Sequence, residues 1–194
     1  MVIINKKILN KYKILIYILF IFINLKSFTK ADDIRDFQIE GISIGDNALK
    51  FFSEKKLISN KRNWYNDNKF YPVLFEIESE KYDYLQLHFK INDSKYKVHA
   101  VGGHKNFNKN PKDCYLLKKE IDGVLRKLFN NSKINEAEMK HPSDKSGESI
   151  VTQTSFTIEN GTVVSACYNM TEKYNSEFRV ILSDKDIYDW NLVA

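Results

Sequence analysis

Three histidines stand close enough along the chain to hold a metal ion. His88 and His99 would become cross-strand neighbours if the segments 82–91 and 96–101 pair around a turn at Asp93-Ser94, and His104 follows two glycines. The Cβ atoms of residues at such positions lie about 5 Å apart, which is close enough for the two side chains to chelate a metal. Histidines on the outer face of a lysine-rich hairpin are more often simply solvated. We therefore expect no metal and no other cofactor, and we keep His88, His99 and His104 as the alternative metal ligands.

The two cysteines, Cys114 and Cys167, point to a disulfide. Cys114 lies on the apolar stripe of a helix expected over 110–131, near its start. A two-residue turn at Asn160-Gly161 would pair Ile158 with Val163, Phe156 with Ser165 and Thr154 with Cys167, which puts Cys167 on the buried face. A nucleophilic thiol needs exposure, and zinc needs more ligands than two distant cysteines supply. We predict a structural Cys114–Cys167 disulfide.

Aromatic side chains are dense in one part of the chain and could form a ligand surface. Such residues stack on sugars or grip peptides when exposed, although ordinary core and rim packing is the alternative. The six residues are Trp64, Tyr65, Phe70, Tyr71, Tyr82 and Tyr84.

Catalytic motifs are missing from the sequence. Carboxylates are plentiful, but no spacing assigns two of them to acid–base work, and no nucleophile elbow, zinc-protease, P-loop or dinucleotide-binding pattern occurs. The segment "HPSDKSGES" gathers His, Ser, Asp and Lys, as hydrophilic loops commonly do. An enzyme would have to use a site that no motif marks.

The N-terminus has the pattern of a secretory signal. Four lysines precede an apolar run from Ile14 to Leu25, and Thr29 and Ala31 provide small residues before a cleavage point. The run is short of the roughly 20 residues that span a membrane, although a retained anchor is the alternative. We expect residues 1–31 to be a signal peptide cleaved after Ala31, and residues 32–194 to be an exported, periplasmic or secreted, single domain without a membrane span.

Removing the signal changes the charge of the chain. The whole chain has 30 basic and 25 acidic residues, whereas residues 1–31 hold six lysines and no acid. The segment 32–194 therefore carries 30 − 6 = 24 basic against 25 acidic residues, a net charge of −1. Nucleic acid is an unsuitable partner for such a chain, since its phosphates are bound chiefly by clustered Lys and Arg.

The hydrophobic patterns predict an α+β domain. Alternating segments indicate strands, the segment 110–131 indicates one long amphipathic helix, and residues 131–148 read as a polar loop. In the first hairpin the expected register pairs Leu87 with Ala100. The expected strands are 71–78, 82–91, 96–101, two in the hairpin within 150–171, and one before a closing helix near 184. This gives an antiparallel sheet of about six strands in two hairpin units, with the long helix packed on one face.

The segment "IRDFQIEGISIGDNALKFFSE", the cysteine-bearing helix, the "DKSG" loop and the late strand cysteine together resemble a group of uncharacterised exported proteins from AT-rich marine bacteria. The resemblance implies export and a common fold, but no activity. The missing motifs, the predicted structural disulfide and the aromatic side chains lead us to expect a non-catalytic binding or interaction module that recognises a protein, peptide or glycan of the cell envelope. A small exported hydrolase is the alternative. Converging Asp, His or Ser side chains in a pocket would favour the enzyme, and a flat aromatic patch or an open sheet edge would favour the module.

Overall fold

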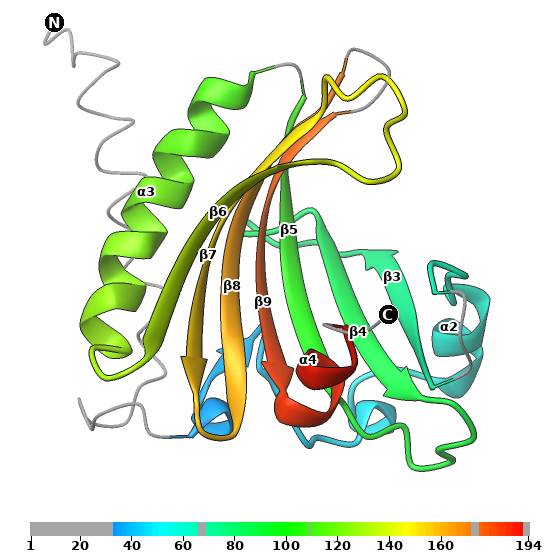
Figure 1. Ribbon diagram of the computed structural model, residues 1–194. Helices are drawn as coiled ribbons and strands as arrows, with labels where there is room; N and C mark the ends of the chain where they lie inside the picture. The colour runs from blue at the N-terminus through cyan, green and yellow to red at the C-terminus, as the bar shows by residue number, and fades with distance from the viewer. Residues whose placement is uncertain (1–32, 66–68, 109, 172–174, 192–194) are drawn as a thin grey trace, which may run out of the picture.

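The computed structural model describes residues 33–65, 69–108, 110–171 and 175–191 (Figure 1). Within them, one antiparallel sheet has seven strands in the order β3-β4-β5-β9-β8-β7-β6, and β1 and β2 form a small two-stranded sheet. The domain is thus of mixed α and β structure, with one more strand in the main sheet than the sequence indicated. The sheet strands are β3 (Phe70–Glu76), β4 (Tyr84–Lys90), β5 (Ala100–Asn108), β6 (Lys133–Lys140), β7 (Ile150–Ile158), β8 (Gly161–Asn169) and β9 (Ser176–Asp184), and the small sheet joins β1 (Gln38–Ile39) to β2 (Ile42–Ser43).

Helix α3 (Pro111–Leu128) carries the chain from the middle of the sheet to its far edge. It leaves β5 and leads into β6, after which β6 to β9 run as a meander that brings β9 back beside β5. The shorter helices are η1 (Ile34–Asp36), η2 (Ala48–Lys50), α2 (Glu54–Ser59) and α4 (Lys185–Asn191). Figure 1 places α3 on one side of the sheet and α2 at the opposite end of the molecule, beside β3.

The face of the sheet under α3 holds the main core. Side chains alternate along each strand, so Val163, Leu182 and Val101, which are register partners across β8, β9 and β5, all point to this face. Each of them is at most 4% exposed. The same cluster takes in Leu57 of α2 and Ile42 of β2, so the N-terminal elements close this core at its other end.

The opposite face is covered over only part of its width. Ile187 and Trp190 of α4 pack there against Phe70 and Ala100. The rest of this face, over β4, β5, β9 and β8, carries polar side chains and forms the candidate site described below.

The predicted disulfide is present. Cys114 and Cys167 are bonded, their Cα atoms lie 5.8 Å apart, and both residues are fully buried between α3 and β8. The packing of the helix on the late hairpin is therefore confirmed, and among the described residues no cysteine is free to act as a nucleophile.

The late hairpin has the expected faces but a shifted register. Ile158 pairs with Gly161, Phe156 with Val163 and Thr152 with Cys167, so the turn lies at Glu159-Asn160 and not at Asn160-Gly161. The shift is two residues, and Cys167 therefore keeps the face that was predicted. Gly161 explains this register, because a Cβ at position 161 would lie 2.4 Å from the carbonyl oxygen of Ser183. Only glycine allows β8 to begin so close to β9.

The first hairpin differs by one residue, and here the faces change. His88 pairs with Ala100 and Leu87 with Val101, so the predicted pairing of Leu87 with Ala100 is wrong. The Asp93 carboxylate holds a longer turn by accepting from the backbone N–H groups of Lys95 and Lys97. β5 also continues through Gly102 and Gly103 as far as Asn108, and a Cβ on Gly103 would lie 2.5 Å from the Tyr82 ring.

The expected loop 131–148 contains the edge strand β6. Seven of its eight residues are exposed, and its sequence, KINEAEMK, has no apolar alternation to reveal it. Strand pairing with β7, not burial of side chains, holds it in place.

No helix in the described part of the chain is both long enough and apolar enough to cross a membrane. The predicted signal peptide, residues 1–31, lies outside the described residues.

Candidate functional site

A chain of polar side chains crosses β4, β5 and β9 on the face opposite α3. We call it the polar network; its members are Tyr65, Gln86, His88, His104, Glu177 and Arg179. The register brings them together, since His104 is the direct cross-strand partner of Arg179, and Gln86 and His88 follow on the neighbouring strand β4. Gln86, His88 and His104 are each at most 4% exposed.

The contacts in the network are continuous. The Tyr65 hydroxyl lies 3.1 Å from Nδ1 of His88, and Nε2 of His88 contacts the Gln86 amide. The Gln86 oxygen is 2.7 Å from Nε2 of His104. Nδ1 of His104 faces Glu177 at 3.5 Å, and Glu177 accepts from Nε of Arg179 at 2.7 Å as well as from its Nη2 group. Four contacts therefore link the Tyr65 hydroxyl to the partly buried Glu177–Arg179 ion pair.

Counting donors and acceptors shows which proton arrangement this chain can hold. With the Gln86 oxygen toward His104, Nε2 of His104 donates to it, so Nδ1 needs a second proton to donate to Glu177. Rotating the Gln86 side-chain amide by half a turn exchanges its oxygen and nitrogen, and His104 then needs no second proton. Nε2 of His104 then accepts from Gln86, and its Nδ1–H donates to Glu177. His88 correspondingly donates from Nε2 to Gln86 and accepts the Tyr65 hydroxyl proton at Nδ1.

The electrostatics favour the arrangement in which both imidazoles are neutral. Burial, helped by the proximity of His104, lowers the pKa of His88 to about 3. Burial also lowers the pKa of His104, and the charge of Arg179 adds to this effect against the opposing influence of Glu177. Burial alone would raise the pKa of Glu177, but the hydrogen bond from His104 and the charge of Arg179 prevail and bring it down to about 2. At neutral pH the network thus holds one carboxylate, one guanidinium and neutral histidines.

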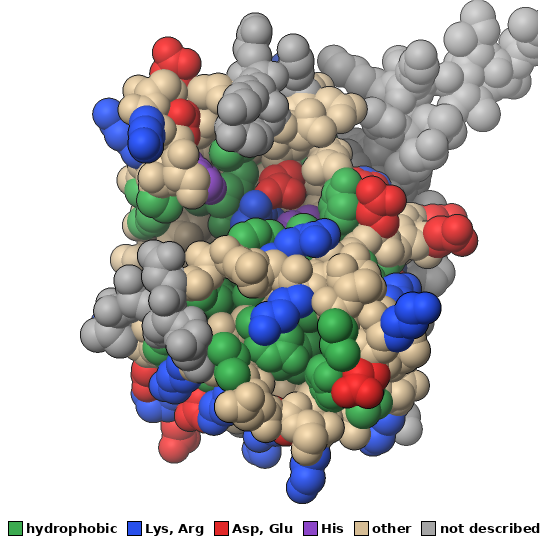
Figure 2. Space-filling view, turned by 90° about the vertical axis from the view of Figure 1, so that its right-hand side faces the viewer, with side chains coloured by type: hydrophobic (Ala, Val, Ile, Leu, Met, Phe, Trp, Pro, Cys, Tyr) green, Lys and Arg blue, Asp and Glu red, His purple; other side chains and the backbone are tan. Residues whose placement is uncertain are grey.

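The network opens to solvent at Arg179. Its guanidinium carbon lies 3.9 Å from the centre of the Tyr168 ring, and its side chain is 23% exposed. The ring of His141 makes an edge-on contact with the ring of Tyr168, with 5.9 Å between their centroids. Ala166, the cross-strand partner of Arg179, and Gln153 on β7 follow on the same face of the sheet. Figure 2 shows histidine, acidic and basic side chains together in a recess of the face turned toward the viewer.

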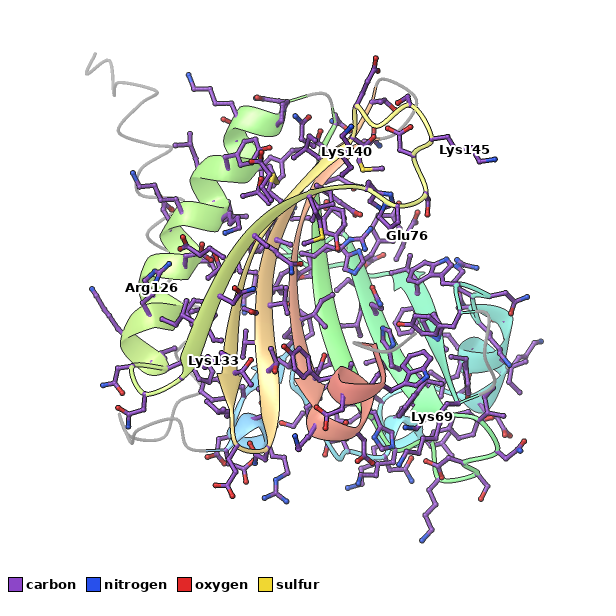
Figure 3. The ribbon with its side chains drawn as sticks, viewed as in Figure 1. Lys69, Glu76, Arg126, Lys133, Lys140 and Lys145 are labelled. Carbon is purple, nitrogen blue, oxygen red and sulfur yellow. A yellow bond between two sulfur atoms is a disulfide. The ribbon has the colours of Figure 1, made fainter. Side chains whose placement is uncertain are left out.

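The loop after β6 forms one wall of this recess. His141 is its first residue, and the backbone of His141 donates to the carbonyl of Ser149 at 2.8 Å. The Asp144 carboxylate accepts from the backbone N–H groups of Ser146 and Ser149. Hydrogen bonds from the side chains of Ser149 and Ser146, together with these backbone bonds, hold the pKa of Asp144 well below its usual range. In Figure 3 this loop leaves β6 at Lys140 and carries Lys145 outward. In the segment "HPSDKSGES", Asp144 thus orders the loop and His141 borders the site.

The three histidines considered as metal ligands do not converge. His99 lies 2.7 Å from the Asp184 carboxylate, whereas His88 and His104 are separated by Gln86. In the described part of the chain no group of three or more His, Cys, Asp or Glu side chains is placed to hold a metal ion.

The six aromatic residues are not brought together on one surface. Phe70 and Tyr82 are buried, on opposite faces of the sheet, while Trp64 is 46% exposed. Tyr71 packs on Phe89, and the Tyr84 hydroxyl donates to Glu76. Tyr65 alone joins the polar network.

A second polar cluster lies under α3. The Lys118 ammonium donates to Asp122 at 2.6 Å and to the Thr154 hydroxyl at 2.7 Å, and all three residues are buried. A groove of about 320 Å³ between α3 and β6 borders it, lined also by Glu136 and Glu138. Figure 3 labels Arg126 on α3 and Lys133 at the start of β6 along this side of the molecule. Lys118, Asp122 and Thr154 bond to one another through Oδ2 of Asp122, while Oδ1 of Asp122 is buried without a hydrogen-bond partner. We interpret this cluster as a polar contact that joins α3 to β7.

Searches with this chain found no matching family model, no similar curated protein and no similar solved structure.

Proposed function

We propose that the chain is an exported, non-catalytic binding module whose ligand is a small carboxylate-bearing molecule of the cell envelope, such as an acidic sugar. The observation that carries this proposal is the polar network itself, which ends in Arg179 at the floor of a recess. Buried polar groups of this number are expensive to desolvate, and apolar side chains of similar size would stabilise a sheet at least as well. Their presence points to a site and not to a packing solution.

The ligand class follows from the groups that border the recess. A guanidinium has five N–H donors; Glu177 accepts from Nε and Nη2 of Arg179, and Tyr168 also bonds to this group. A carboxylate is the acceptor that best matches a guanidinium. The Tyr168 ring and the His141 ring beside it offer apolar surface for the body of such a ligand.

The hydrolase alternative has less support, although two histidines belong to the polar network. Each network histidine has both ring nitrogens engaged, and a carboxylate with a pKa of about 2 is a weak base. The network as defined contains no serine, threonine or cysteine nucleophile. These side chains are suited to fixing Arg179, not to moving a substrate proton.

Calorimetric titration with glucuronate tests the proposal, with glucose as the neutral control of the same shape. We expect binding of glucuronate and none of glucose. Arg179→Lys keeps the charge but loses the planar fork, so the affinity should fall at least about tenfold. Arg126→Lys, an exposed arginine on α3, should bind as the wild type does. Equal binding by both sugars, or full affinity in the Arg179→Lys variant, would refute the assignment.

Export is the second part of the proposal. The buried disulfide supports it, because such bonds form and persist in oxidising compartments. Mass spectrometry of the protein from its native cells should find a mature chain that begins at Asp32. An intact N-terminus in a membrane fraction would contradict it.

A further inference from the structure

The segment from Leu49 to Arg62, which spans η2 and α2, combines exposed apolar and basic side chains. Leu49, Phe51 and Ile58 are 40%, 43% and 61% exposed. They belong to a group of only seven large hydrophobic side chains that are exposed among the described residues. The basic residues interleaved with them are Lys50, Lys55, Lys56, Lys61 and Arg62.

The charge of this segment contrasts with the rest of the domain. Five basic residues and one acid, Glu54, give 5 − 1 = +4 within 49–62, whereas residues 32–194 as a whole carry −1. The remainder therefore carries −1 − 4 = −5. Even the single acid is engaged, since Glu54 accepts the Tyr96 hydroxyl at 2.8 Å. An anionic surface would attract this end of the molecule and repel the others.

The basic side chains lie along the apolar surface. Lys56 is over the rings of Phe52 and Phe75, at 5.2 and 4.9 Å from their centres, and Lys61 is 4.4 Å from that of Tyr71. Figure 1 places α2 at the end of the molecule farthest from α3, and Figure 2, which looks at that end, shows hydrophobic side chains gathered beside Lys and Arg.

We propose that this segment docks the domain on an anionic phospholipid surface. Exposed aromatic and aliphatic side chains beside lysines are what a protein uses to rest in the headgroup region without spanning the bilayer. Each basic residue near such a surface strengthens binding about fivefold. A membrane surface satisfies both the apolar and the basic side chains, whereas an acidic soluble partner would leave Phe51 and Ile58 in water. Docking is independent of whether the N-terminal segment is cleaved, and it would hold the ligand recess close to the envelope.

A fluorophore that reports polarity can be attached at Ile58→Cys in the full chain. The native cysteines are bonded to each other, so the new thiol is the reactive one. Leu116→Cys on α3, where the native residue is 49% exposed, gives the matched label on the far side. With phosphatidylcholine vesicles that contain an equal part of phosphatidylglycerol, the emission at position 58 should shift to the blue and that at position 116 should not. Phosphatidylcholine alone should give no shift at either position.

Charge reversal separates docking from other causes. Lys50→Glu with Lys55→Glu should weaken the vesicle-dependent shift at position 58 at least about twentyfold, while Lys119→Glu with Lys127→Glu on α3 should leave it unchanged. Circular dichroism confirms that both variants fold. The proposal is overturned by equal shifts at both labels, by a shift that ignores lipid charge, or by a concentration-dependent shift without vesicles, which would show contact between two copies.

Discussion

The residues of the polar network could be found only in part from the sequence. Histidines draw attention in any chain, and His88 and His104 were marked as candidates, but for a metal. Gln86, Glu177 and Arg179 stand in ordinary strand sequence and carry no signal of their own. They become a site because the meander brings β9 back beside β5, which is far from it in sequence. Such a long-range pairing is not encoded by any local pattern.

His88 should make the stability of the domain dependent on pH. Its pKa is about 3 when folded and 6.5 in the unfolded reference. The unfolded chain therefore takes up a proton near pH 6.5 that the folded chain takes up only near pH 3. The stability gained from neutral His88 is complete above pH 6.5 and is lost as the pH falls toward 3, by up to about 1.4 kcal/mol per pH unit for one proton.

Urea unfolding between pH 7 and pH 4.5 measures this effect. His88→Gln should reduce the slope of unfolding free energy against pH by up to one proton, and should also lower the stability at pH 7. Lys127→Gln, an exposed change on α3, should leave the slope as in the wild type. A His88→Gln variant with an unchanged slope would show that this imidazole is protonated in the folded state as easily as in water.

At the scale of elements, the apolar segments were predictable and the polar or glycine-dependent ones were not. The spacing of apolar residues predicts helix α3, and it also predicts which side chains of the late hairpin are buried. β6 was missed because an edge strand can be charged along its length. The register of the first hairpin was missed because the Asp93 turn and the two glycines of β5 read as a loop.

Gly161 sets the register of the late hairpin, so its replacement should be costly. The backbone carbonyl of Ser183 would lie 2.4 Å from an alanine Cβ, and neither strand can move without breaking its ladder. We expect Gly161→Ala to destabilise the domain by about 1–3 kcal/mol. Gly123→Ala is the control on α3, where nothing lies within 4 Å, and it should stabilise by about 0.5–1 kcal/mol. Chemical denaturation measures the free energy of unfolding of both variants. If Gly161→Ala leaves it unchanged, the close approach of β8 and β9 is disproved.

The charges of β6 should prevent the domain from pairing with itself. Two copies of β6 could pair antiparallel around a two-fold axis. In the registers that pair most of the strand's residues, Glu136 lies opposite either Glu138 or Glu136 of the second copy. Like charges directly opposite destabilise a strand pair, and charged edges generally block such association.

Replacing Glu136 and Glu138 by threonine should therefore allow dimers to form. Size-exclusion chromatography with light scattering would detect them. Lys133→Thr with Lys140→Thr removes two charged residues from the same strand but leaves the glutamates, and should remain monomeric. If both double variants stay monomeric at high concentration, the glutamates are not what protects this edge.

For the whole molecule, the disulfide ties the longest helix to the centre of the sheet. It spans 53 residues of sequence, for which chain entropy suggests about 4 kcal/mol. Replacing both cysteines by alanine should lower the free energy of unfolding by about 2–5 kcal/mol. Reductant should lower the melting temperature of the wild type and leave that of the double variant unchanged. A wild type indifferent to complete reduction would show that α3 holds its place without the bond.

Neutral, hydrogen-bonded histidines are proposed to fix Arg179 at the floor of a ligand recess. Long-range ¹⁵N–¹H spectra of the imidazoles test this arrangement directly, because the chain has only four histidines. At pH 7 we expect His88 to be neutral with its proton on Nε2, and His104 to be neutral with its proton on Nδ1. Glucuronate should then move the signals of His104 and His141 and leave His99 in place. Imidazolium signals for His88 and His104 that titrate near pH 6.5, or a response to glucuronate confined to His99, would contradict the account.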